Sequence, residues 1–463
     1  MNANRRTFLK TVGQGTLAAS LVMSLPELAK SEADAADGGA RNAGNAAGVA
    51  AQSSVAASSS ANFSKEYLAN QVFWEQPLSL NPVPAGRYDI VTDPSRKEAM
   101  GTAGGGKQTK SGVFAQPNGD LQIKIYAPET KNVEVYFLAM EPRPRIALQK
   151  QDDGMHTGVF PFDPTFCGPM STDIYFDGTI LLYPYIPIFW HRERPVNFIE
   201  IPDPETDWIQ LRDVPHGAFA RELFPTKSFG VQRCMVYTPP DYYKGGEFPV
   251  LYLQAGSGEN ESTWEYNGRA AHIVDNLLAE SKCKPFIIVT CDGGVGNDAA
   301  GQYTQRVPDH DSMAAFRDML LNDVIPFIES RYRVKKGKWN RAMAGLSRGC
   351  RQTSSTGIPH PEVFGYLGMF SGYMASATET GGRPEELAIL RDPKRFANEF
   401  KVVFRSMGAA DHLMPHFLED NKKFEEGGLD KMPNYHYKLY PNQQHVWGAF
   451  RRGLHDFAQL IFT

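Results

Sequence analysis

One serine in the sequence stands in a setting that favours nucleophilic chemistry. Residues 345–349 read Gly-Leu-Ser-Arg-Gly and match the pattern G-x-S-x-G, with Ser347 at its centre. In this motif the serine occupies a sharp, strained turn, and a Cβ at either glycine would collide with the neighbouring strand or helix. The pattern alone is weak, but residues 342–344 predict a buried strand before it and residues 350–356 a helix after it. We therefore expect Ser347 to be a nucleophile.

A serine hydroxyl needs a base that removes its proton, and the base needs an acid that orients it. In a strand–turn–helix setting of this kind, the acid and then the histidine follow the nucleophile along the chain. Asp411 comes shortly after the predicted strand 402–407, and His445 lies between the predicted strand 435–439 and the last helix. These positions predict a catalytic triad in which Asp411 sets the tautomer of His445, the general base for Ser347.

Other residues compete for these two roles. Asp420 is an alternative to Asp411 as the acid, and the sequence leaves this alternative open. His412 and His416 precede the last predicted strand, so we interpret them as loop or rim residues. His455 falls inside the closing helix, where a histidine usually packs or faces solvent.

Acyl transfer also needs N–H donors for the negative oxygen of the intermediate, and the loss of one donor typically costs ~10²–10³ in rate. The backbone N–H of Arg348, directly after the nucleophile, is the first predicted donor. The second is expected in residues 254–258, Gln-Ala-Gly-Ser-Gly, because glycines let the backbone approach a substrate closely. Ser257 is the preferred donor there, and Gly256 is the next.

The sequence predicts neither a metal nor a cofactor. Its eleven histidines are dispersed, with no HExxH motif and no Cys/His cluster at ligand spacing. The five cysteines are odd in number and include no CxxC pair, so we expect no disulfide framework, although a single bridge is left open. Cys350 is interpreted as a small buried hydrophobe rather than a second catalytic group.

The elements that must position these residues follow an α/β pattern over residues 205–463. Continuous apolar runs, typical of parallel strands covered on both faces, occur at residues 233–237, 250–253 and 286–290. Helices are predicted at residues 270–281, 313–332 and 447–461. Further strands are predicted at residues 342–344, 366–370, 402–407 and 435–439. This alternation of strands and helices predicts a doubly wound α/β domain.

Residues 63–204 show β signals instead. Short strands are predicted at residues 121–126, 133–137, 155–160 and 174–176. Asp177-Gly178 follows the last of them and is a favoured hairpin pair. Because no convincing helix separates these strands, we expect an immunoglobulin-like β-sandwich. The aromatic-rich residues 183–190 are expected to pack against the catalytic domain, with a substrate surface as the alternative.

The first residues predict an export signal. Residues 5–10 read Arg-Arg-Thr-Phe-Leu-Lys, a twin-arginine pattern, and the apolar run 17–25 is far shorter than the roughly 20 residues of a membrane span. We interpret residues 1–35 as a twin-arginine-type signal peptide; an ordinary secretory signal would give the same export to the periplasm, cell surface or exterior. Residues 36–62, rich in Ala, Ser, Gly and Asn, are a predicted flexible linker.

Composition narrows the class of partner. The chain has 463 residues, of which 42% are hydrophobic, and a formal net charge of −4. This length predicts two folded units. The charge gives no reason to expect nucleic acid or an anionic membrane, and after signal removal we expect no stable membrane span. A small-molecule or saccharide ester is the expected partner.

The catalytic half resembles the esterase D-like carbohydrate esterases, which include feruloyl and acetylxylan esterases. The motifs that carry this resemblance lie at residues 237–242, 248–253, 256–258 with Glu261 and Trp264, 345–349, 408–411 and 445–447. The resemblance implies an α/β-hydrolase fold for residues 205–463. It also implies a serine esterase that cleaves acylated saccharides or phenolic (feruloyl or hydroxycinnamoyl) esters through an acyl-enzyme. The β-rich half resembles the carbohydrate-binding module of glycogen-debranching enzymes, through residues 123–128, 133–136 and 175–178.

The sequence departs from this family at three places. Ala255 stands where the family usually has a histidine before the oxyanion-loop glycine, and Arg348 stands where an apolar residue is frequent. Two glutamines, Gln443 and Gln444, precede His445 where the family has two glycines. These departures leave the triad intact and put the usual xylan-ester substrate in question.

Other functions remain as alternatives. They are a siderophore (enterochelin-type) or other small-molecule esterase, acyl transfer to a sugar, and a non-catalytic binding protein on a hydrolase scaffold. A chain trimmed to begin near residue 205 would keep the triad and both predicted N–H donors. From the sequence, such a chain is expected to cleave small activated esters, with a greater loss on larger saccharide esters.

Overall fold

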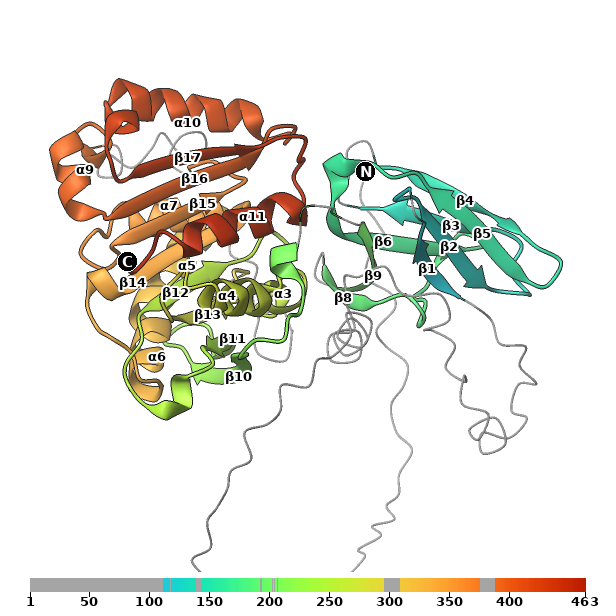
Figure 1. The fold of residues 1–463 in the computed structure, drawn as a ribbon, viewed down its shortest axis with the longest axis horizontal. Coiled ribbons are helices and arrows are strands. Elements are labelled where there is room, and N and C mark those ends of the chain that lie inside the picture. The colour runs from blue at the N-terminus through green and yellow to red at the C-terminus, as the bar shows by residue number, and fades with distance from the viewer. Residues whose placement is uncertain are drawn as a thin grey trace, which may run out of the picture. The chain divides into compact units, whose positions relative to one another are not determined.

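The computed structural model describes residues 111–294, 309–374 and 388–463, except positions 117, 139–142, 192–193, 202, 204 and 206. The predicted signal peptide, the predicted linker and the first part of the predicted sandwich lie outside the described residues. The described strands form two sheets, one from β1 to β9 and one from β10 to β17 (Figure 1).

The second sheet has the order expected for a doubly wound domain. Its strands, in spatial order, are β10 (Ala218–Pro225), β11 (Val231–Thr238), β13 (Ile287–Cys291), β12 (Val250–Gln254), β14 (Arg341–Leu346), β15 (Tyr366–Phe370), β16 (Val402–Gly408) and β17 (Tyr435–Tyr440). The pairs β10–β11 and β11–β13 are antiparallel, and every later pair is parallel. Because the carboxyl ends of the parallel strands meet at one edge, the loops that follow them can build one site there.

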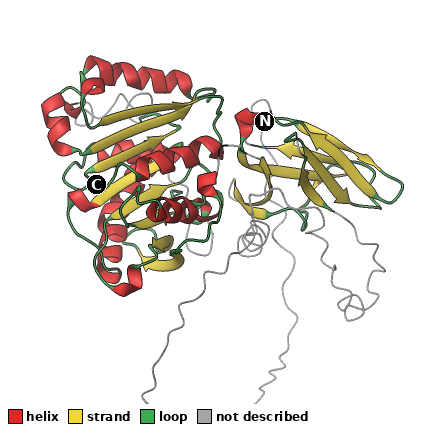
Figure 2. Cartoon of the chain, in the orientation of Figure 1, coloured by secondary structure: helices red, strands yellow, loops and turns green. Residues whose placement is uncertain are grey.

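Helices cover both faces of this sheet. They are α3 (Thr263–Tyr266), α4 (Ala270–Ala279), α5 (Asp309–Met319), α6 (Ile325–Arg331), α7 (Arg348–Gly357), α9 (Pro393–Glu399), α10 (Met414–Glu426) and α11 (Trp447–Ala458). Figure 2 shows them in red against the yellow strands. This arrangement confirms the predicted α/β-hydrolase fold.

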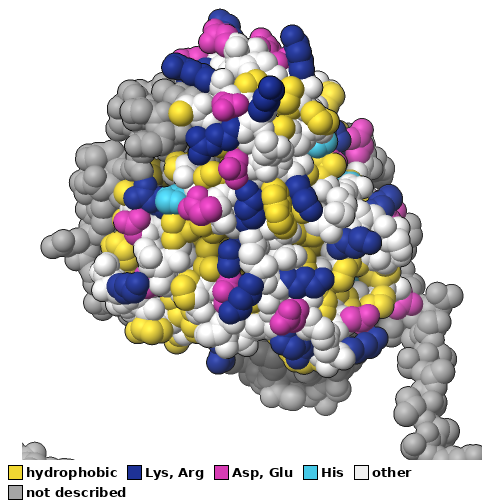
Figure 3. Space-filling model, turned by 90° about the vertical axis from the view of Figure 1, so that its left-hand side faces the viewer, with side chains coloured by type: hydrophobic (Ala, Val, Ile, Leu, Met, Phe, Trp, Pro, Cys, Tyr) yellow, Lys and Arg dark blue, Asp and Glu magenta, His cyan; other side chains and the backbone are white. Residues whose placement is uncertain are grey.

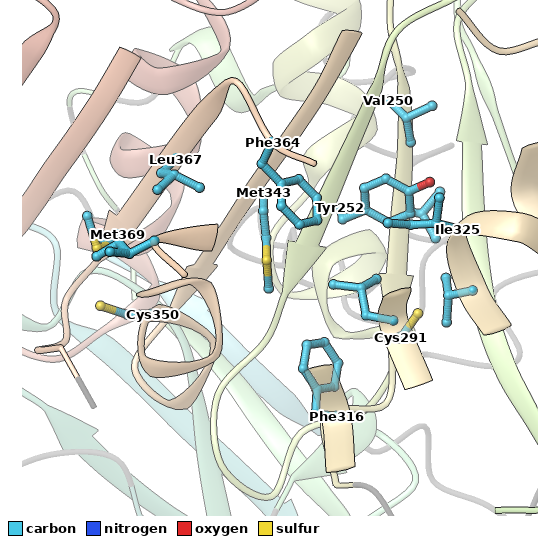
Figure 4. Close-up of a cluster of buried hydrophobic side chains, with 14 of the residues drawn as sticks. Val250, Tyr252, Cys291, Phe316, Ile325, Met343, Cys350, Phe364, Leu367 and Met369 are labelled. Atoms are coloured by element: carbon cyan, nitrogen blue, oxygen red, sulfur yellow. The ribbon is translucent and has the colours of Figure 1, made fainter. Parts of the chain in front are cut away.

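The period of two along each strand explains the two layers of helices. In β14, Met343 packs in a cluster with residues from α5, α6, α7, α9 and α10, whereas Ala342 and Ala344 pack in another cluster with α4 and α11. Figure 4 shows part of the first cluster, with Met343, Tyr252 and Phe364 pointing into it. Successive side chains of a strand point to opposite faces, so a strand covered on both faces must be continuously apolar.

The first sheet folds into the predicted β-sandwich. Its strands, in spatial order, are β1 (Gly112–Ala115), β2 (Leu121–Tyr126), β5 (Met155–Phe160), β4 (Arg145–Lys150), β3 (Val133–Phe137), β6 (Gly168–Phe176), β9 (Arg194–Ile201) and β8 (Ile188–His191), while β7 (Thr179–Ile180) pairs with β6. Alternate residues of β2 and β3 are buried in one cluster. The predicted hairpin turn is present, because Asp177 and Gly178 have φ of 47° and 84°.

Some elements differ from the sequence-based expectation. The single helix predicted over residues 313–332 is interrupted by a π-helical turn, Leu320–Val324. Residues 414–426 form α10, so His416 lies on a helix. The sequence had indicated a loop or rim residue at this position.

Two surface properties bear on the expected partners. No helix among the described residues combines the length and the apolar character that crossing a membrane requires. On the face drawn in Figure 3, Lys and Arg side chains are interspersed with Asp and Glu side chains, and the described residues gather no large patch of either sign.

Candidate active site

Ser347 occupies a strained turn between a strand and a helix. Strand β14 ends at Leu346 and α7 begins at Arg348, so Ser347 alone connects them. Its backbone has φ of 52° and ψ of −113°, a region that residues with a Cβ rarely adopt. The N–H of Ser347 donates to the carbonyl oxygen of Phe370 at 3.0 Å, which ties the turn to the neighbouring strand β15.

The two glycines of the motif allow this turn. A Cβ on Gly345 would lie 2.5 Å from the carbonyl carbon of Gly349, and a Cβ on Gly349 would lie 2.6 Å from the carbonyl oxygen of Gln254. Both distances are far below ordinary contact, and the obstructing atoms are backbone atoms that have no room to move. The predicted collision with the helix and the neighbouring strand is therefore confirmed.

His445 and Asp411 form a hydrogen-bonded pair. The Nδ1 atom of His445 lies 2.8 Å from Oδ2 of Asp411, whose carboxylate is fully buried, while the His445 side chain is 20% exposed. The other carboxylate oxygen of Asp411 accepts the N–H of Leu413 at 2.9 Å. A carboxylate that accepts at Nδ1 fixes the tautomer in which Nε2 is free to take a proton.

The loops that carry the pair are joined through their backbones. The N–H of Ala410 donates to the carbonyl oxygen of Gln443 at 2.9 Å. A Cβ on Gly408 would overlap the carbonyl oxygens of Gln443 and Gln444, so this approach requires a glycine at the end of β16. The His445 ring also packs edge-on against Phe450, with the ring centroids 5.0 Å apart.

The structure does not bring the competing acid to His445. Asp420 lies on α10, where its Oδ2 accepts the N–H of Met374 at 2.7 Å and lies 3.3 Å from Nη2 of Arg405. Both side chains of this ion pair are buried, so Asp420 serves the packing of α10 against the sheet.

His416 and His455, which the sequence offered as alternatives to His445, pack against other aromatic side chains. His416 packs against the ring of Tyr373 at 5.0 Å, and His455 against the ring of Trp208 at 4.6 Å. His412 is different, because its ring centroid lies 4.9 Å from that of His445.

The predicted oxyanion loop lies beside the nucleophile. A Cβ on Gly256 would stand 3.6 Å from the Cβ of Ser347. The N–H of Gly256, however, donates to Oε2 of Glu259 at 2.7 Å and is therefore occupied, which removes the second-choice donor. Ser257 is exposed at the same loop. Arg348 is the first residue of α7 and follows Ser347 directly, as the sequence-based choice of donor requires.

Glu259 is a residue of the site that the sequence analysis missed. It is buried next to Gly256, and a hydrogen bond links it to the Trp447 side chain. Burial raises the pKa of its carboxyl to about 7, although these hydrogen bonds and the nearby His445 oppose the rise. The available indication was an acidic residue directly after a glycine-rich stretch, where a charge is costly unless it has partners.

The described residues that could ligate a metal ion coincide with the acid–base pair. The potential ligand atoms of Asp411, His412 and His445 lie within 4.8 Å of one another. Two of these residues already form the acid–base pair, so the cluster belongs to the same site. All five cysteines are free, and burial raises the pKa of the Cys350 thiol to about 12, which keeps it protonated and unreactive.

The raised pKa of Glu259 gives a testable pH dependence of stability. Because the folded protein holds this proton more tightly than the unfolded chain, the stabilisation is complete below pH 4.5 and is lost as pH rises through about 7. Relative to Glu259→Gln, the wild-type free energy of unfolding should therefore fall by up to about 1.4 kcal/mol per pH unit in this window. Urea unfolding at several pH values measures this difference. The exposed Glu425→Gln is the control, and parallel curves for wild type and Glu259→Gln would contradict the assignment.

Comparison with known proteins finds that this chain is similar to esterases. Residues 231–459 match the family described as "Putative esterase". "Endo-1,4-beta-xylanase/feruloyl esterase" of Xylanibacter ruminicola is 35% identical over 359 residues, which are 74% of this chain and 45% of that protein. "Endo-1,4-beta-xylanase Y" of Acetivibrio thermocellus is 23% identical over 271 residues, which are 53% of this chain and 23% of that protein. The chain therefore spans less than half the length of these curated relatives.

A solved structure shares the fold over most of this chain. The enterobactin esterase of Shigella flexneri aligns with a TM-score of 0.51 and 14% identity, covering 73% of this chain and 92% of that one. At this identity the likeness concerns the fold alone.

Proposed function

We propose that the chain is a serine carboxylic ester hydrolase of the esterase family whose model matches residues 231–459. The observation that carries the proposal is the combination of Ser347 on its strained turn with the His445–Asp411 pair, at 2.8 Å, at the same edge of the sheet. A strained serine and an oriented imidazole at one edge of a parallel sheet are the groups that acyl transfer requires.

The reaction would proceed through two acyl transfers. His445 takes the hydroxyl proton while the Oγ of Ser347 attacks the ester carbonyl, and Asp411 stabilises the resulting imidazolium. The backbone N–H groups of Arg348 and Ser257 are the proposed donors to the oxyanion. Collapse of this intermediate breaks the ester bond, and His445 gives its proton to the leaving alcohol. Water, deprotonated by His445, then attacks the acyl-enzyme; the acid is released, and His445 returns the proton to Oγ of Ser347.

The proposed substrates are acylated saccharides and phenolic esters of the feruloyl type. The resemblance in residues 237–264 and the name of the Xylanibacter ruminicola relative support this class. The β-sandwich is proposed as a carbohydrate-binding module only by resemblance.

A panel of four esters tests the proposal. Purified protein would be incubated with p-nitrophenyl acetate, methyl ferulate, acetylated xylan and an enterobactin-like triester. We expect hydrolysis of methyl ferulate or acetylated xylan, unchanged by EDTA, because no metal takes part in the proposed steps. Cleavage of the triester alone would favour the siderophore esterase, and no cleavage of any ester would favour a binding protein. Activity lost to EDTA and restored by zinc would overturn the mechanism.

We also propose that the chain is exported. Residues 1–35 would be the signal and residues 36–62 the linker, before domains over residues 63–204 and 205–463. The motivation is the pair Arg5-Arg6. Fractionation of cells that express the full chain should find it outside the cytoplasm, and replacing both arginines with lysine should retain it inside. Export of the double variant through the ordinary secretory route would contradict the twin-arginine assignment.

A further inference from the structure

His445 lies near the end of the short loop, residues 441–446, between β17 and α11. The N–H of Val446 donates to the carbonyl oxygen of Gln444 at 3.0 Å, which closes a three-residue turn around His445. A turn of this size has few internal hydrogen bonds, so its position depends on what packs against it. One side of the loop bonds to the Asp411 loop, as described above.

The other side of the loop bonds to the β-sandwich. Residues 164–167, here called the 164–167 segment, form the last part of the connection between β5 and β6 of the sandwich. The N–H of Gln444 donates to the carbonyl oxygen of Thr165 at 3.1 Å. The side-chain amide of Gln443 donates to the carbonyl oxygen of Pro164 at 3.0 Å. The two residues that precede His445 are thus both held by this segment.

The residues that follow His445 meet the same part of the sandwich. The N–H of Gly448 donates to the carbonyl oxygen of Cys167 at 3.0 Å. Gly168 has φ of +105°, and a Cβ there would stand 3.0 Å from the Gly448 nitrogen and 3.1 Å from the Trp447 Cβ. This close backbone contact fixes the first turn of α11, which begins two residues after His445.

Apolar packing and ion pairs reinforce the same contact. The Val446 side chain is 2% exposed and belongs to the hydrophobic cluster of the sandwich, together with Phe166. Further along α11, Nη1 of Arg451 lies 3.0 Å from Oε1 of Glu200 at the end of β9, and both side chains are buried. Because removing one partner of a buried ion pair strongly destabilises the folded protein, this pair should hold α11 against β9.

We propose that the 164–167 segment is a positioning element for His445, and that the β-sandwich thereby completes the active site. This inference rests on the proposed function. Its reason is geometric: His445 must meet Asp411 and Ser347 at once, and a misplacement of about 1 Å costs ~10²-fold in rate. The sequence had favoured a catalytic domain that works when trimmed to residue 205 onward. We now expect such a domain to lose turnover on small esters as well.

Gly168→Ala in the full chain tests the proposal, with Gly178→Ala as the matched control. Both glycines lie in the sandwich at positive φ, +105° and +84°, but a Cβ on Gly178 would meet nothing within 4 Å. The readout is the rate constant and the final extent of fluorophosphonate labelling of Ser347. We expect Gly168→Ala to label about 10–100-fold more slowly than Gly178→Ala, yet to reach one label per chain.

A second pair of variants covers the case in which Gly168→Ala does not fold. Val446→Ala and Val133→Ala each remove two methyl groups from the same sandwich cluster, but only Val446 lies next to His445. We expect slow labelling for Val446→Ala and a wild-type rate for Val133→Ala.

The outcomes separate the two proposals. Equal labelling rate constants within each pair of variants would overturn the positioning role. Incomplete labelling at the wild-type rate would also overturn it, because a merely structural defect lowers the fraction of active protein and not the rate constant of that fraction. Absence of a label on Ser347 in the wild type would instead reject the proposed function.

Discussion

Replacing Ser347 with alanine is expected to lower kcat for p-nitrophenyl acetate by ~10⁶ while leaving the fold intact. The loss is large because serine, histidine and aspartate act as a unit, so that removing the nucleophile removes nearly all of their contribution. The Ser347 backbone has φ of 52°, which alanine tolerates about as poorly as serine, so stability should change little. Initial rates and urea unfolding measure the two effects.

Ser371 offers a matched control for this substitution. It is a buried serine at φ of 40°, directly after the parallel strand β15 that neighbours β14. Ser371→Ala should keep turnover within a few-fold of wild type. If Ser347→Ala retained wild-type turnover, or if the two variants lost it equally, Ser347 would not be the nucleophile.

Replacing Asp411 with asparagine is the second large expected effect. Asparagine keeps the shape but can present an N–H to Nδ1 of His445, which then holds the wrong tautomer for a base. In serine proteases this change costs ~10⁴ in kcat, and we expect a loss of that order here with little change in KM. Steady-state kinetics on p-nitrophenyl acetate provides the measurement.

Asp420→Asn is the control, because it alters the competing acid. Asp420 on α10 forms a buried ion pair with Arg405 on β16, so its replacement should lower the free energy of unfolding by up to about 3–5 kcal/mol. Turnover of the folded protein should be nearly unchanged. The opposite ranking of the two variants in kcat would transfer the role of acid to Asp420.

Much of the site could be predicted because its signals are local. The glycines around Ser347 encode the turn directly, and β15, Tyr366–Phe370, was predicted with the bounds that the structure has. Asp411 and His445 each follow a strand that was predicted from the alternation of strands and helices, at residues 402–407 and 435–439. Order along the chain then placed both side chains at one edge of the sheet.

The remainder depends on contacts that no local pattern records. The bond between Gln443 and Pro164 joins residues 279 positions apart, and a glutamine in a loop gives no indication of that partner. Glu259 was missed because an acidic residue near glycines usually faces solvent. Here its carboxyl is buried and forms hydrogen bonds with the Gly256 N–H and the Trp447 side chain. The ion pair of Asp420 with Arg405 has no local signal either, so the sequence left Asp420 open as an alternative acid.

Identification of the residue that a fluorophosphonate modifies tests the central claim most directly. The full-length protein would be labelled in the buffer used for the activity assay and digested, and the modified residue would be located by tandem mass spectrometry. His445→Ala would be treated in parallel. We predict one phosphonyl group per chain, on Ser347, and labelling at least ~10²-fold slower in His445→Ala, since general-base catalysis contributes typically 10²–10⁴. A label on another residue, or equal labelling of Ser347 without His445, would contradict the proposed mechanism.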